Sequence, residues 1–155
     1  TAEMFSQLMK IALFDFWMAN EDRNANNANL MYDVAVDKFV SIDYGCIFNT
    51  ATFDYPLSQL TSTDTILWSD LFNHLIQGLD KDYIWHLSKQ LKQDFSHSIQ
   101  VCNSLKTEIV DEIPKEWNVP YTVIKNKVDQ LFDEKWTTEV WNNFIECLNE
   151  NMNHE

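Results

Sequence analysis

The sequence is poor in glycine: Gly45 and Gly78 are the only two among 155 residues. Phosphate-binding loops of the Walker and dinucleotide types need several glycines at fixed spacing, because only glycine lets the backbone approach a phosphate closely or adopt a positive φ at no cost. The sequence therefore excludes both kinds of loop. Its hydrophobic content of 45% is nevertheless enough for one folded domain, which we expect to span residues 1–155.

Cysteines and long apolar runs are also scarce. Cys46, Cys102 and Cys147 are widely spaced and form no C-x-x-C pair, which argues against a disulfide framework and against a zinc site. No apolar run is long enough to cross a bilayer, and the N-terminus lacks the basic and then apolar order of a signal peptide. These absences favour a protein of the reducing cytoplasm.

Positive charge is in short supply as well. Eleven Lys and Arg residues stand against 24 Asp and Glu, so the formal net charge is -13. Because nucleic acids and anionic membranes are bound mainly through Lys and Arg, we expect neither as a direct partner. An anionic small molecule such as a nucleotide is compatible with this charge if a metal ion accompanies it and screens the carboxylates.

The apolar spacing predicts a mostly helical chain with one short β-hairpin. Residues 2–19 carry apolar side chains at three- and four-residue spacing, which is typical of an amphipathic helix. An asparagine-rich stretch ends this helix, because short amides and carboxylates compete for nearby backbone groups. Two short strands follow, around residues 30–32 and 39–42, and we expect a turn to join them.

Helices are expected through the rest of the chain, over residues 55–155. One apolar stripe covers residues 67–76, and Gly78 stands where a helix commonly ends in a left-handed residue. Another helix begins near Lys81, and Pro120 opens the last one. We expect that last helix to carry a single stripe of apolar residues: Val128, Phe132, Trp136, Val140, Phe144 and Leu148.

Acidic and amide side chains recur around the predicted hairpin. Asp22 lies in the asparagine-rich loop, Asn27 follows five positions later, and Asp43 ends the second strand shortly before Gly45. Phosphoryl transfer uses such groups: one carboxylate orients the acceptor hydroxyl and takes its proton, while an amide oxygen and a second carboxylate hold magnesium on the nucleotide phosphates. Because the hairpin carries the chain out and back, we expect the end of its second strand to return beside the loop.

The run F-D-F-W-M-A-N-E-D-R-N-A-N-N-A-N-L at residues 14–30, followed by I-D-Y-G at residues 42–45, resembles the HipA-like kinases, distant relatives of the protein kinases and phosphoinositide lipid kinases. By this resemblance Asp22 is the catalytic-loop aspartate, and Asn27 and Asp43 are the residues that bind Mg²⁺ and the phosphates of ATP. The resemblance implies the C-terminal lobe of a protein-kinase-like fold. It also implies transfer of the γ-phosphoryl group of ATP to a hydroxyl, most naturally of a protein Ser or Thr.

The chain departs from the family pattern in two respects. Many relatives have a histidine two positions after the catalytic aspartate, where this chain has Asn24. A kinase N-terminal lobe, with its phosphate-covering loop and strand lysine, lies upstream of the catalytic loop, and only 21 residues precede Asp22. We therefore expect residues 14–45 to be the catalytic and metal-binding segment of a lobe that is inactive alone and belongs to a longer protein. Arg23 we interpret as a structural ion-pair partner rather than a phosphate ligand.

Other interpretations use the same residues. Asp22 and Asn27 are residue types that commonly cap turns between a helix and a strand. The chain could also be a degenerate kinase lobe or a helical partner-binding module without enzymatic activity. Finally, Asp22, Asn24, Asn26 and Asp33 match positions one, three, five and twelve of an EF-hand calcium loop, although Asn27 replaces its glycine. The phosphoryl acceptor, the protein partner and the oligomeric state stay open at this stage.

Overall fold

The structure, a computed structural model, describes residues 1–51, 54–114, 116 and 120–153. Over these ranges the chain is mostly helical with one two-stranded antiparallel hairpin, as the sequence predicts. The elements in chain order are α1 (Ala2–Met18), β1 (Leu30–Asp33), β2 (Lys38–Ser41), α2 (Ile47–Ala51), the 3₁₀ turns η1 (Ser62–Asp64) and η2 (Ile66–Trp68), α3 (Asp70–Ile76), α4 (Lys81–Ser104), α5 (Lys106–Asp111), α6 (Tyr121–Leu131) and α7 (Glu134–Met152).

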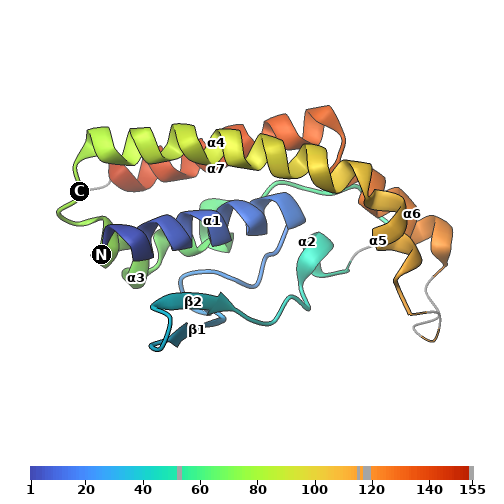
Figure 1. Cartoon of the computed structure of the whole chain (residues 1–155), viewed down its shortest axis with the longest axis horizontal. Coiled ribbons are helices and arrows are strands. Elements are labelled where there is room, and N and C mark those ends of the chain that lie inside the picture. Colours follow the sequence, from blue (N-terminus) through green and yellow to red (C-terminus); the bar gives the residue numbers. More distant parts are fainter. Residues whose placement is uncertain (52–53, 115, 117–119, 154–155) are drawn as a thin grey trace.

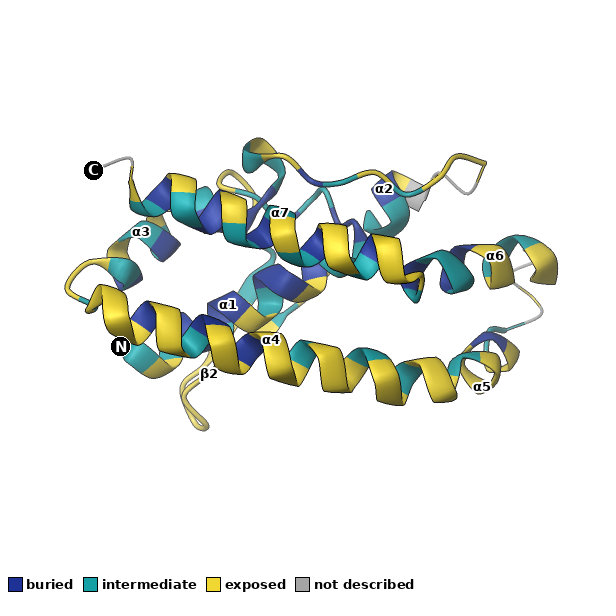
Figure 2. Cartoon of the chain, turned by 90° about the horizontal axis from the view of Figure 1, so that it is seen from above, coloured by how far each residue is buried: buried dark blue, intermediate teal, exposed yellow. Residues whose placement is uncertain are grey.

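Helix α1 lies at the centre of the molecule. The long helices α4 and α7 run along one side of it, and the β1–β2 hairpin lies on the other side (Figure 1). Viewed from above, α1 lies between α4 and α7, which turn their exposed faces outward (Figure 2). Helix α1 contacts α7, α3 and β2. It therefore separates the helical body from the loop and hairpin that carry the predicted site.

The core side chains of α1 explain this central place. One side of the helix is fully buried through Phe5, Leu8, Met9, Ala12 and Phe16. The ring of Phe16 meets Phe144 of α7 edge to face, with centroids 5.7 Å apart, and Phe5 meets Phe72 of α3 at 5.2 Å. Burial of a side chain of this size contributes about 1.5–3 kcal/mol, so this face alone strongly favours the observed packing.

The ends of two helices agree with the sequence. α1 was expected over residues 2–19; it ends at Met18, and Ala19 caps it in a left-handed conformation with φ of 49°. Gly78 follows α3 with φ of 82°, the backbone conformation expected of a residue just beyond a helix end.

Two helical predictions were wrong. The single last helix after Pro120 is in fact two, because the chain breaks at Phe132 and Asp133. The Asp133 carboxylate accepts hydrogen bonds from the N–H groups of Lys135 and Trp136 and thereby caps α7. The apolar stripe continues across this break, so periodicity alone could not reveal it. Residues 56–61, expected to be helical, form no regular element.

The structure also describes the cysteines and the apolar character of the helices. The three cysteines are unpaired, with Cys147 buried and the other two half-buried. Across the described ranges, no helix combines the length and the apolar character that crossing a membrane requires.

Candidate active site

The loop of residues 19–29 leaves α1 and leads to the hairpin. Its first bond keeps it close to the helix, since the N–H of Asn20 donates to the carbonyl oxygen of Asp15 at 2.9 Å. Further along, Asn24 and Asn27 exchange backbone hydrogen bonds of 3.0 and 3.2 Å, which turn the chain back on itself. The side-chain oxygen of Asn24 also accepts from the N–H of Asn26 at 3.0 Å. Asn24 therefore shapes the turn at the position where many relatives have histidine.

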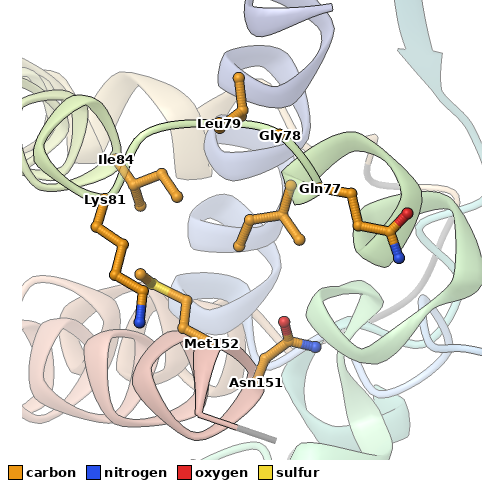
Figure 3. Close-up of a pocket in the computed structure, with 8 residues that line it drawn as sticks. Gln77, Gly78, Leu79, Lys81, Ile84, Asn151 and Met152 are labelled. Atoms are coloured by element: carbon orange, nitrogen blue, oxygen red, sulfur yellow. The ribbon is translucent and has the colours of Figure 1, made fainter. Parts of the chain in front are cut away.

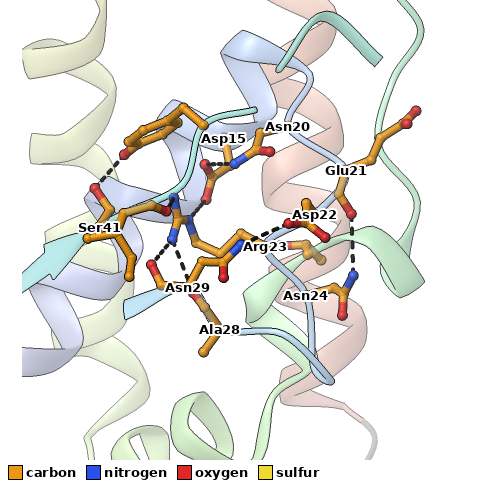
Figure 4. Close-up of polar contacts among 12 residues, drawn as sticks. Asp15, Asn20, Glu21, Asp22, Arg23, Asn24, Ala28, Asn29 and Ser41 are labelled. Carbon is orange, nitrogen blue, oxygen red and sulfur yellow. Dashed lines mark hydrogen bonds and ion pairs between the residues drawn. The ribbon is translucent and has the colours of Figure 1, made fainter. Parts of the chain in front are cut away.

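Arg23 is the centre of this loop and is fully buried (Figure 4). Its Nε donates to Asp15 Oδ2 at 2.8 Å, so the ion pair expected for this residue is confirmed. Nη1 donates to the backbone carbonyl oxygens of Ala28 and Asn29, and Nη2 donates to that of Ile42 at 3.2 Å. The guanidinium thus joins α1, the end of the loop and the end of β2.

Asp15 is the counter-charge of this arginine and is nearly as deeply buried. Burial raises the pKa of the Asp15 carboxyl to about 6, and the nearby positive charge of Arg23 only partly opposes this rise. Asn20 also opposes it by donating from Nδ2 to Asp15 Oδ1 at 2.8 Å. The cause of the raised pKa is loss of hydration, which disfavours the charged carboxylate.

Asp22 and Asn27, the predicted base and metal ligand, lie on the two sides of the turn. Asp22 is half-buried, and its Oδ2 accepts a hydrogen bond from Asn29 Nδ2 at 2.9 Å. Asn27 is exposed, and its side chain makes no hydrogen bond to another described residue. Asp22 is therefore held in place, whereas the Asn27 amide is not held by the described part of the protein.

Asp43, the second predicted metal ligand, follows the end of β2. It is exposed and has a φ of 55°, a conformation that aspartate and asparagine adopt more readily than most residues. Its Oδ1 accepts the N–H of Gly45 at 3.2 Å. A side chain at position 45 would place its Cβ 3.2 Å from that same oxygen, so glycine leaves room for the carboxylate.

Tyr44, the residue after Asp43, packs against Arg23. The Arg23 guanidinium lies 5.0 Å from the centroid of the Tyr44 ring, within range of a cation–π contact. The same ring meets Phe14 of α1 edge to face at 5.6 Å, and its hydroxyl forms a hydrogen bond with Ser41. The residue after Asp43 is therefore held by contacts to α1, to Arg23 and to β2.

The end of β2 meets the loop of Asp22 through Ile42, the residue before Asp43. The N–H of Ile42 donates to the carbonyl oxygen of Asn29 at 2.9 Å, and Arg23, the residue after Asp22, donates to the carbonyl oxygen of Ile42. The hairpin thus returns the end of β2 beside this loop, as the sequence predicts. Burial raises the pKa of the nearby Cys46 thiol, and the negative charges of Asp22, Asp43 and Glu21 raise it further.

Glu21 also connects the loop to the segment that follows Asp43. Its two carboxylate oxygens accept hydrogen bonds of 2.8 Å from Asn49 Nδ2 and from Thr50 Oγ1. The N–H of Asn49 donates to the carbonyl oxygen of Ala19 at 2.9 Å. In this segment, α2, residues 48–50 all have positive φ. The turn after Asp43 is therefore attached to the loop before Asp22.

The donor set around Asp22 and Asp43 suits magnesium. This ion prefers oxygen ligands and commonly takes only one or two from the protein, the others coming from water and phosphate. Asp43 and Asn27 would supply a carboxylate and an amide oxygen. In the described part of the chain no three His, Cys, Asp or Glu side chains gather as a metal site.

The EF-hand interpretation does not agree with the fold. Asp33, the twelfth residue of that pattern, lies in strand β1, whereas an EF-hand loop continues into a helix. The cap interpretation was made for Asp22 and Asn27; in the structure the Asp22 carboxylate accepts a hydrogen bond from the side chain of Asn29.

The sequence analysis missed the residues that hold Arg23 and Asp22 in place. It named Arg23, but it did not name Asp15, Asn20 or Asn29 for this role. A signal for Asp15 exists, because it lies three positions after Ala12 on the buried face of α1, where an acidic residue needs a partner.

A separate pocket lies at the far end of the helical body, at the α3–α4 turn and the end of α7 (Figure 3). Its walls include Gln77, Lys81 and Asn151, and none of the predicted site residues lines it. The candidate site is instead an open, acidic surface at the loop and hairpin.

Comparison with known proteins points to kinases. Residues 5–143 match the family model of the HipA-like kinases. The chain therefore belongs to the HipA-like kinase family, and the resemblance seen in the sequence is confirmed. Comparisons with curated proteins and with solved structures gave no match.

Proposed function

We propose that this chain is the C-terminal, catalytic lobe of an ATP-dependent kinase that transfers the γ-phosphoryl group to a hydroxyl, that of a protein Ser or Thr. Membership of the HipA-like family supports the class of reaction. The observation that carries the proposal is the junction at Ile42, where Arg23 and Asn29 bond the residue before Asp43 to the loop of Asp22, since phosphoryl transfer needs a carboxylate at the acceptor and another at the metal.

Asp22 has the role of the base that orients the acceptor hydroxyl and takes its proton. One of its carboxylate oxygens is occupied by the Asn29 amide, which fixes the direction of the group. Exposure of the loop beside it leaves the carboxylate accessible to a substrate. Positioning and electrostatics provide nearly all the catalysis in this reaction class, so a fixed carboxylate is the contribution required.

Asp43 and Asn27 have the role of holding Mg²⁺ on the phosphates of ATP. Magnesium, when bound, neutralises the charge that develops on the transferred group. Positive charge from this lobe is limited, because Arg23 is buried and its guanidinium is turned to carbonyl oxygens rather than to solvent. Phosphate therefore meets this lobe through the metal, and direct cationic contacts come from elsewhere in the kinase. A cytoplasmic location stays a prediction.

The test is Mg²⁺-dependent ATP turnover by the intact natural protein with Asp22→Asn or Asp43→Asn. Loss of a general base typically costs about 10²–10⁴-fold, and we expect a fall in kcat of at least that order for Asp22→Asn. Asp82→Asn, at an exposed position on α4, is the matched control and should keep full activity. Turnover that survives either site substitution would contradict the mechanism and favour a degenerate lobe or a binding module.

A further inference from the structure

Arg23 is the only arginine in the sequence, and its side chain is fully buried. We propose that it is a positioning residue: its guanidinium fixes Asp22, Asn27 and Asp43 relative to one another, and it does not bind phosphate itself. This inference rests on the proposed function, because it concerns the same metal site.

The first argument is where the guanidinium hydrogen bonds go. Arg23 bonds the carbonyl oxygens of Ala28 and Asn29 at the end of the loop and of Ile42 at the end of β2. Asp15 on α1 neutralises its charge. A planar guanidinium can serve several acceptors at once in fixed directions, which a lysine ammonium cannot do over the same span.

The second argument is the sequence position of the three site residues. Asp22 immediately precedes Arg23, and Asn27 immediately precedes Ala28, whose carbonyl oxygen Arg23 binds. Asp43 follows Ile42, another bound residue, and precedes Tyr44, whose ring lies against the guanidinium. Each site residue is thus adjacent in sequence either to Arg23 itself or to a residue that Arg23 binds.

The third argument concerns the backbone at Asn29 and Asp43. Both residues have positive φ, 44° and 55°, a conformation that persists where neighbouring contacts impose it. The carbonyl oxygen of Asn29 accepts from Arg23 and also from the N–H of Ile42, at 2.9 Å for the latter. Arg23 therefore stabilises the junction at which the loop and the end of β2 meet.

The structure argues against a direct role on phosphate. Full burial and the four hydrogen bonds to protein oxygens leave no face of the Arg23 side chain toward solvent. A phosphate ligand needs its donors exposed in a cleft. We therefore expect substitution of Arg23 to change the geometry of the metal site rather than to remove a charge from it.

The experiment measures Mn²⁺ binding, as a probe of the magnesium site, to wild-type protein and to Arg23→Lys. Loss of a residue that orients metal ligands typically costs about 10–100-fold in metal affinity, and we expect a rise of that size in the Kd for Mn²⁺. Tyr44→Leu removes the ring contact with Arg23, together with the Phe14 contact and the Ser41 hydrogen bond, and should raise the Kd by at least about twofold, the lower end for a cation–π contact.

A second readout is independent of metal. Amide hydrogen exchange at Ile42 reports the bond to the Asn29 carbonyl oxygen, and we expect it to speed up in Arg23→Lys. Val140→Ala, a substitution in the buried face of α7, is the control: it lowers overall stability but should leave both the Kd for Mn²⁺ and the relative protection of Ile42 close to wild type.

The outcomes separate the inference from the function on which it rests. If wild-type protein binds Mn²⁺, Asp43→Asn abolishes binding, and Arg23→Lys binds as tightly as wild type with unchanged exchange at Ile42, the positioning role is wrong and the proposed function stands. If wild-type protein binds no Mn²⁺, or Asp43→Asn binds normally, the proposed metal site is wrong and the inference falls with it. A weakened Kd matched equally by Val140→Ala also overturns the inference.

Discussion

The loop-and-hairpin region, residues 19–45, and the helical body around α1 are ordered by different means. The helical body is held by many apolar side chains, each contributing a part: the buried set runs from Phe5 in α1 to Leu148 in α7. The loop is held mainly by polar contacts, of which the buried Arg23 makes the largest share and Glu21 and Asn24 make others. Apolar packing thus distributes stability over the body, whereas order in the loop depends strongly on one buried arginine.

The proposed function would explain this difference. A surface that is to meet nucleotide and metal would have to keep carboxylates and amides exposed, so apolar packing could not cover it. A buried cation that binds backbone carbonyl oxygens orders such a segment from its buried side and leaves its exposed side chains accessible. The cost is a strong dependence on one residue pair.

The largest effect is expected from Asp15→Ala. Removing one partner of a buried ion pair leaves an uncompensated charge and typically costs about 3–5 kcal/mol, so we expect the free energy of unfolding to fall by that amount. Urea unfolding followed by circular dichroism measures it. Asp15→Asn, which keeps an acceptor for Arg23 Nε, should lose less. Equal losses in the two variants would mean that charge does not hold the loop.

A slightly smaller effect is expected from Leu148→Ala. This side chain is fully buried, and truncation of a core leucine typically costs about 2–5 kcal/mol. Because it acts on the helical body, we expect the same relative loss of protection in amides of α1 and α7 and no selective loss at Ile42. Hydrogen exchange measures both. Selective opening of the loop in this variant would contradict the division between the two regions.

The pH dependence should isolate Asp15. The pKa of Asp15 is raised to about 6 in the folded protein, against its ordinary value of 3.8 in an unfolded chain. The folded state therefore binds an extra proton between these values. The stabilising contribution of this group is complete below about pH 4 and is lost as the pH rises through 6. Carboxyl NMR should give a midpoint near 6 for Asp15; a midpoint near 4 would mean that the charge of Arg23 and the Asn20 hydrogen bond fully offset desolvation.

The smallest effect is expected from Asp133→Ala at the start of α7. The lost side chain accepts from the N–H groups of Lys135 and Trp136, and such caps contribute typically about 1 kcal/mol. Thermal unfolding measures the change. Asp133→Asn and Asp133→Ser keep a capping acceptor and should recover most of it. No difference between alanine and serine at this position would rule out the capping role.

Helices and hairpin could be predicted from sequence because side-chain spacing records which face is buried. The start of α1, the β1–β2 hairpin and the place of Gly78 were predicted in this way. The break at Phe132 was not, because the stripe keeps its phase across it. The signal that could have located it is the Asp133-Glu134 pair, an aspartate of the kind that begins helices.

The candidate site was predicted in part. Asp22, Asn27 and Asp43 stand out because their residue types and spacing indicate a chemistry. The partners of Arg23 do not, because three of them are backbone carbonyl oxygens, which any residue can supply. The positive φ of residues 48–50 in α2 could not be predicted from the sequence either, because Phe48 and Thr50 are residue types that rarely adopt positive φ.

The burial of the only arginine also determines how the protein meets proteases. A protease that cleaves only after arginine has one target bond in this sequence, between Arg23 and Asn24. The side chain that such an enzyme must grip is inaccessible in the folded state, so cleavage requires local opening of the loop. The rate of cleavage at this one bond would then report the opening of the loop at a known residue, without any label.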